Sequence, residues 1–127
     1  MHQPVLVEDV SLTLTAMGRL PGTLIKWFLE ELGNDGLCKL ADGLDSRAAV
    51  AEIMYGLHDG ADTHFFYAAN NGQIAKTPRG SLGFGWNSIF IPDGYQKTLA
   101  EMTDKELRGI GLRSHALTKL RKFLEQN

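Results

Sequence analysis

The sequence has a single cysteine, Cys38, no long apolar run and no marked excess of either charge. One cysteine excludes a disulfide within the chain, so nothing here requires an oxidising compartment. A membrane-spanning helix needs about 20 consecutive apolar residues, whereas the apolar runs here are short, and we expect no membrane insertion. The first four residues also lack the basic and then apolar layout of a signal peptide. We therefore expect a cytoplasmic protein.

The charges nearly balance, because 13 Lys and Arg stand against 15 Asp and Glu, which gives a formal net charge of −2. A protein dedicated to nucleic acid usually carries a basic surplus or stripe, so we expect no nucleic-acid partner. With 127 residues, 43% of them hydrophobic, the chain is long enough to bury a core. No repeat, low-complexity tract or linker divides it, and we expect a single domain over residues 1–127.

Hydrophobic patterning predicts a mixed α/β (α+β) protein in which strands outnumber helices. Strands are expected over 4–9, 11–15, 47–57, 64–69 and 88–91. One helix is expected from residue 24 to Gly33, and Asn34 is placed to cap a short second one. Thr103 and Glu106 have capping-box spacing. The last stretch predicts a helix with one apolar face, made of Leu112, Ala116, Leu120 and Phe123.

Turns are expected where Gly, Asn, Asp and Pro gather. Asp59-Gly60 between two strand-like runs predicts a hairpin, and the segment 70–72 (Asn-Asn-Gly) predicts a further turn. His58, Asp59, Asp62 and His64 surround the hairpin, which raises the alternative of a metal site. Turns recruit Asp for backbone reasons, and no metal-ligand spacing is present, so the turn interpretation is favoured.

Two adjacent acids, Glu8 and Asp9, end the first apolar strand. Carboxylates at a strand end can hold Mg²⁺ or activate a water molecule. The alternative is a strand end that is polar only for solubility, which is the commoner situation. Because neighbouring strand residues point to opposite faces, we expect only one of the two acids in any given site.

The glycine-rich segment 78–87 is the most unusual stretch of the chain. Arg79 carries a planar donor fork suited to phosphate. Phe84 and Trp86 offer flat faces for a purine, and Asn87 offers both a donor and an acceptor to a base edge. The alternative is an ordinary loop whose aromatic side chains pack beneath it.

Lys26 lies within the otherwise apolar first helix. One interpretation is a contact with phosphate. The other is a surface lysine paired with Glu30 at helical spacing, which is the commoner situation.

Four stretches taken together resemble the inosine triphosphate pyrophosphatase family: VLVEDVSL at 5–12, LPGTLIKWFLE at 20–30, PRGSLGFGW at 78–86 and IFIPDGYQKTLAEM at 89–102. The resemblance covers nearly the whole chain. It implies a curved mixed β-sheet with flanking helices around a nucleotide cleft, usually in a homodimer. It also implies Mg²⁺-dependent hydrolysis of ITP, dITP or XTP to the monophosphate and pyrophosphate.

The resemblance also implies roles for individual residues. Asp9 would be the acid that activates water, with Glu8 beside it near the metal, and Lys26 would reach the phosphates. Phe84 and Trp86 would border the base pocket. At the same end, Arg113 would match the family's arginine near the base.

The chain departs from the family pattern at several positions. The family's opening strand, its phosphate-binding loop and the helices that follow are not matched, so we expect a shortened version of the fold. Asn87 replaces an aspartate, and Leu107, Gly111 and Leu112 replace a lysine, a serine and a histidine. Two hypotheses follow: a divergent pyrophosphohydrolase acting on purine nucleotides, or a non-catalytic module that binds another small molecule or oligomerises.

Overall fold

A computed structural model describes residues 4–81 and 85–126 and confirms the mixed α/β class. The elements in chain order are β1 (Val5–Leu14), η1 (Thr15–Met17), β2 (Pro21–Gly22), α1 (Ile25–Asp42), β3 (Ala48–His58), β4 (Thr63–Ile74), β5 (Phe90–Pro92), η2 (Leu99–Glu101), α2 (Asp104–Ile110) and α3 (Leu112–Glu125). Here η denotes a short 3₁₀ helix, a tighter turn than the α-helix.

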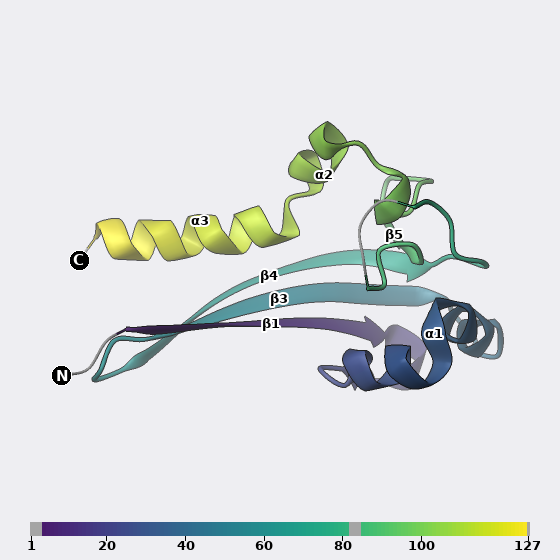
Figure 1. Cartoon of the computed structure of the whole chain (residues 1–127), viewed down its shortest axis with the longest axis horizontal. Coiled ribbons are helices and arrows are strands. Elements are labelled where there is room, and N and C mark those ends of the chain that lie inside the picture. Colours follow the sequence, from purple (N-terminus) through teal and green to yellow (C-terminus); the bar gives the residue numbers. More distant parts are fainter. Residues whose placement is uncertain (1–3, 82–84, 127) are drawn as a thin grey trace.

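The strands form one five-stranded sheet in the order β2-β1-β3-β4-β5. Each pairing that the structure describes is antiparallel, rather than the mixture of parallel and antiparallel strands that the resemblance implies. The long strands β1, β3 and β4 run the length of the molecule (Figure 1). Helix α1 and strand β5 lie at one end of these strands and α3 at the other, so the sheet supports two separate cores.

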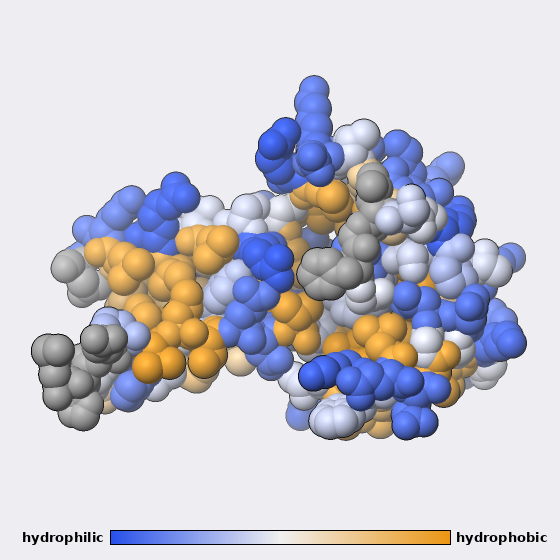
Figure 2. All heavy atoms as spheres, in the orientation of Figure 1, coloured by the Kyte–Doolittle hydropathy of each residue, from blue (hydrophilic) through white to orange (hydrophobic). Residues whose placement is uncertain are grey.

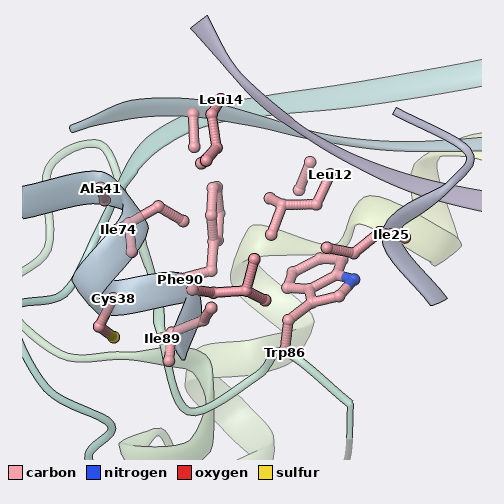
Figure 3. Packing of buried hydrophobic residues seen from close by; sticks show 12 residues of the cluster. Leu12, Leu14, Ile25, Cys38, Ala41, Ile74, Trp86, Ile89 and Phe90 are labelled. Atoms are coloured by element: carbon pink, nitrogen blue, oxygen red, sulfur yellow. The ribbon is translucent and has the colours of Figure 1, made fainter. Parts of the chain in front are cut away.

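The first core lies where α1 and β5 meet the sheet. Leu12 and Leu14 of β1 pack against α1, and Phe90 and Ile74 close the layer from β5 and β4 (Figure 3). Each of these four side chains is almost completely buried. Burying a large apolar side chain contributes about 1.5–3 kcal/mol, so this cluster anchors α1 to the sheet.

The second core lies under α3. Ala116 and Leu120 are buried against Phe66 and other residues of β3 and β4, with Phe123 packed at the margin. The apolar face predicted for the last helix is therefore confirmed. The predicted capping box is also present, because the Thr103 hydroxyl accepts from the Glu106 N–H and the Glu106 carboxylate accepts from the Thr103 N–H, at 3.2 and 3.1 Å.

Helix α1 has a kink at Gly33, the position where the sequence predicts a helix to end. The helix continues to Asp42, but Gly33 has φ 68° and ψ 176°, which interrupts the regular helical backbone. Only glycine adopts such a φ without strain. Asn34 does not cap the second half; its side-chain amide instead donates to the Gly85 carbonyl. In the described ranges no helix, α1 included, combines the length and apolarity needed to cross a membrane.

Two predicted interruptions of the strands are wrong. β1 continues through Val10, between the two predicted strands, because every residue from Val5 to Leu14 pairs with β3. β4 runs through the predicted turn at 70–72 because those residues pair with β3 on one side. Gly72 also pairs with β5, where a Cβ would lie 2.3 Å from the Ile91 carbonyl oxygen. Glycine here permits a close approach of strands rather than a turn.

The hairpin between β3 and β4 is held by a carboxylate, as the turn interpretation predicts. One oxygen of Asp59 accepts from the N–H groups of Ala61 and Asp62 at 3.0 and 2.9 Å, and the other lies 3.2 Å from His64 Nε2. The two backbone N–H groups and then His64 lower the pKa of Asp59 from 3.8 to about 2. Among the described residues, no group of three or more His, Cys, Asp or Glu is arranged to hold a metal, so the alternative of a metal site at this hairpin is not supported.

We predict that Gly72→Ala lowers the free energy of unfolding by about 1–3 kcal/mol, because the new methyl group overpacks the contact between β4 and β5. Gly109→Ala in α2 is the matched control, since nothing lies within 4 Å of its Cβ position. That change should be neutral or stabilise the fold by up to about 1 kcal/mol. Urea unfolding measures both. Equal stability of the two variants would show that the close approach is not required.

We predict that Asp59→Ala destabilises the fold at neutral pH but not near pH 1.5. The folded pKa is depressed, so the ionised carboxylate stabilises the fold above pH 3.8 and this stabilisation is lost as the pH falls through about 2. Urea midpoints of the two proteins should therefore converge in acid. Asp62→Asn is the control, because Asp62 contributes a backbone N–H to this turn. A constant difference across the pH range would contradict the prediction.

Candidate functional site

A cleft of about 680 Å³ opens between the first half of α1, the sheet and the start of α3. This volume lies in the range of small-molecule sites. Its lining is mostly apolar and comes from segments far apart in the sequence: Glu8, Val10, Ile25, Lys26, Leu29, Glu30, Ile53, Gly85, Trp86, Asn87, Leu99, Leu112 and Arg113. The fold thus assembles a concave, largely apolar site with a few polar groups.

The cleft brings together five of the residues that sequence reasoning proposes for the site. These are Glu8, Lys26, Trp86, Asn87 and Arg113. They come from β1, α1, the end of the glycine-rich segment and α3, and only the tertiary structure makes them neighbours. Phe84, the other aromatic residue proposed for the site, lies outside the described residues.

Asp9 is not among the lining residues, although Glu8 is. Successive residues of a strand point to opposite faces. Glu8 shares its face with Val10, which packs into both cores, whereas Asp9 shares its face with Ser11 and pairs with Met54. The expectation that only one of the two acids enters a given site therefore agrees with this geometry.

Glu8 makes an ion pair with Arg113 across the mouth of the cleft. Arg113 Nη2 donates to Glu8 Oε1 at 2.5 Å, and the two residues are 105 positions apart. Tyr55, which pairs with Glu8 in the sheet, lies beneath this pair. Burial raises the pKa of Tyr55, and the neighbouring Glu8 raises it further while Arg113 acts in the opposite direction. Glu8, Tyr55 and Arg113 thus form one coupled group.

The described residues do not form a metal site by themselves. No group of three or more His, Cys, Asp or Glu is arranged for one in the ranges 4–81 and 85–126. Glu8, the acid expected near the metal, is engaged by Arg113, and Asp9 points to the other face. Magnesium binding through both acids does not fit this arrangement.

Trp86 forms the flat apolar wall of the cleft. Its side chain is 8% exposed and its ring meets that of Phe90 edge-on, with centroids 5.6 Å apart. Figure 3 shows the indole lying between Phe90 and Ile25. Trp86 therefore packs on the core, as the loop interpretation predicts, and it also lines the cleft.

Lys26 and Glu30 occupy the α1 side of the cleft, one helical turn apart. Together with Glu8 and Arg113 they give the lining two carboxylates and two cations, so the formal charges balance. Glu8 and Arg113 are already paired with each other. The positive charge that can attract a negatively charged ligand is therefore that of Lys26, on the α1 side of the cleft.

Arg79 does not reach this cleft. Its guanidinium donates to the Gln96 carbonyl at 2.8 Å and lies 3.3 Å from the Glu101 carboxylate. Its own carbonyl accepts from the buried Thr98 hydroxyl at 2.7 Å. Arg79 thus ties the glycine-rich loop to the segment before α2. The structure gives it a part in holding the loop and does not place it beside the other proposed site residues.

Comparison with known proteins identifies the family. A sequence model of the Ham1 family matches residues 1–123. The chain belongs to the Ham1 family. This Ham1-family chain is 47% identical over 124 residues to the inosine triphosphate pyrophosphatase of Schizosaccharomyces pombe, a match that covers 96% of this chain and 65% of that protein.

Two further comparisons agree with this assignment. The chain is 41% identical over 128 residues to the inosine triphosphate pyrophosphatase of Yarrowia lipolytica, covering 99% of this chain and 68% of that protein. The structure superposes on a HAM1 protein from Coxiella burnetii with a TM-score of 0.86 at 25% identity, covering 98% of this chain and 68% of the other. The Ham1-family chain thus spans about two thirds of the length of the proteins it matches.

Sequence reasoning missed several residues of the site. Tyr55 carries no local signal, because it becomes part of the site only through its pairing with Glu8. Leu112 departs from the family pattern, and the structure places it in the cleft wall. Helical spacing predicts Glu30 as a partner for Lys26 but does not indicate that Glu30 lines the cleft.

Proposed function

We propose that this chain hydrolyses non-canonical purine nucleoside triphosphates to the monophosphate and pyrophosphate. The observation that carries the proposal is that one cleft gathers Lys26, Trp86, Asn87 and Arg113. The relatives named inosine triphosphate pyrophosphatase support the same activity. They give no support to the non-catalytic alternative, which we therefore do not pursue.

The polarity of the cleft favours one orientation of the nucleotide. The purine is expected to lie against Trp86, whose indole offers a flat apolar face. Asn87 and Arg113 have hydrogen-bonding groups for the base edge. The phosphates are expected to extend towards Lys26, since the charge of Arg113 is already balanced by Glu8.

Leu112 in the cleft wall predicts weak discrimination between different purine bases. Strict selection between bases depends on polar groups that are satisfied by one base alone. Leu112 lines the cleft next to Arg113 and has no such group. We therefore expect the ratio of kcat/KM between ITP and GTP to be modest, on the order of 10, which is the range that apolar pockets reach.

Magnesium and a cytoplasmic location remain predictions. Mg²⁺ is often held by one or two carboxylates together with the substrate's phosphates. Such a metal would enter with the nucleotide and would not need the cluster of acids that the described residues lack. Titration of Mg²⁺ against activity, with Ca²⁺ as the comparison ion, tests this expectation.

We predict that Asp9→Asn leaves kcat nearly unchanged, because Asp9 lies on the sheet face away from the cleft. A loss of about 10²–10⁴ in kcat would instead identify Asp9 as the general base that the family resemblance implies. Lys26→Ala should raise KM for ITP about tenfold, because a cation facing the phosphates is lost. Lys39→Ala is the control on the same helix, outside the cleft lining. Pyrophosphate release from ITP, XTP, GTP and ATP is the measurement. A chain that releases no pyrophosphate from any of them would refute the proposed function.

We also propose that the chain assembles as a homodimer. In the described ranges, β1 pairs with β2 only at Leu12 and Thr13, so the edge of 5–11 has no strand beside it. The sheet face there, opposite α3, is apolar and exposed, and we term it the sheet-end patch: Val5, Val7, Met54, Phe65 and Tyr67. Figure 2 shows apolar side chains gathered at this end of the molecule. A free edge bordered by apolar residues is a template for another strand, and two identical strands pair around a two-fold axis.

We predict a dimer in light scattering at micromolar concentration and a monomer for Phe65→Glu. Phe65 is 63% exposed, so the charge should leave the folded chain intact while it disrupts the sheet-end patch. Tyr95→Ser, which removes an exposed aromatic ring outside the patch, is the control. A monomeric unaltered chain would show that the patch is not covered by a second copy.

A further inference from the structure

The ion pair between Glu8 and Arg113 links the sheet to the first turn of α3. Gly111, with φ 54°, ends α2 and begins α3. This left-handed residue lets the chain change direction so that α3 starts over the cleft. The Arg113 side chain is 55% exposed and that of Glu8 is 38% exposed. Arg113 therefore depends on its partner for a defined position.

The contacts of Glu8 are those expected of a residue that orients an arginine, and they are not those expected of a metal ligand. One carboxylate oxygen receives the Arg113 guanidinium at 2.5 Å. Tyr55, which is 4% exposed, sits beside both side chains. In the described ranges Glu8 belongs to no group of three or more His, Cys, Asp or Glu that is arranged to hold a metal. A charge-assisted hydrogen bond of this kind is strong and directional.

The pairing also decides what Arg113 recognises. An unpaired arginine in the cleft would attract the triphosphate and compete with Lys26 for it. Once paired, its charge is balanced, and its remaining N–H groups still donate to neutral acceptors such as a purine carbonyl. Glu8 thus separates the two ends of the cleft into one that takes the base and one that takes the phosphates.

We propose that Glu8 is a positioning residue, which fixes the Arg113 guanidinium at the base end of the cleft and does not bind magnesium. This inference rests on the proposed function for the identity of the ligand. It replaces the expectation from the family resemblance that Glu8 lies near the metal. It also makes the specificity of the cleft depend on a contact between two distant parts of the chain.

The test compares Glu8→Ala and Glu8→Gln with the unaltered chain. Binding of inosine, which has no phosphate, should weaken about tenfold in Glu8→Ala, whereas binding of inorganic tripolyphosphate should weaken less than twofold or become tighter. Glu8→Gln keeps an acceptor for Arg113 and should recover most of the inosine affinity. Glu31→Gln, on the exposed part of α1, is the charge-matched control and should change neither.

The enzymatic readout separates positioning from metal binding. In Glu8→Gln we expect the Mg²⁺ concentration for half-maximal activity to change less than twofold, while KM for ITP rises more than kcat falls. A shift of tenfold or more in the Mg²⁺ requirement would identify Glu8 as a metal ligand and overturn the proposal. Unchanged inosine binding in Glu8→Ala would also overturn it, as would the absence of inosine binding to the unaltered chain.

The binding experiments do not need turnover, so failure of the proposed function can be distinguished from failure of this inference. If the chain releases no pyrophosphate but inosine binding follows the expected order, the hydrolytic function is refuted and the role of Glu8 stands. Thermal unfolding monitors whether each variant is folded. The side-chain Nε–H resonance of Arg113 should broaden or shift when Glu8 is removed if the two groups are paired in solution, because a free guanidinium exchanges its protons with water faster.

Discussion

The pairing register of β1 with β3 is the constraint on which the site depends. It places Glu8 opposite Tyr55 and Asp9 opposite Met54. Because the side-chain period of a strand is two, a slip of one residue would move every side chain to the other face. Leu12 and Leu14 resist such a slip, since both would leave the core for the opposite face. The burial of two leucines thus determines which acid meets Arg113.

Two glycines with positive φ, Gly33 and Gly111, change the direction of the chain at the cleft. The bend at Gly33 allows the first half of α1 to line the cleft, while Asn34, just beyond it, holds the Gly85 carbonyl at 2.9 Å. The left-handed Gly111 ends α2 and begins α3, so that Leu112 and Arg113 in the first turn of α3 line the cleft. In both places a helix end is used to position a side chain at the cleft. The site is therefore built from breaks in helices as much as from the helices themselves.

Features that depend on interactions between nearby residues are predicted correctly from the sequence. The capping box of Thr103 and Glu106, the bend at Gly33 and the buried face of α3 each involve residues within a few positions of one another. The segment 70–72 could not be read in this way. Its turn-forming residues are overridden by pairing with β3 on one side and, at Gly72, with β5 on the other. Local propensity is weaker than two sets of backbone hydrogen bonds.

The sequence by itself determined the family, the mixed α/β class and five of the residues that line the cleft, because these follow from motifs and from the spacing of apolar side chains. The tertiary structure alone decided how those residues are grouped. It joined Glu8 to Arg113, turned Asp9 to the other face and engaged Arg79 with Gln96 and Glu101. The reason is physical: an arginine's partner is the nearest acceptor in space, and the sequence contains no distance between residues 105 positions apart.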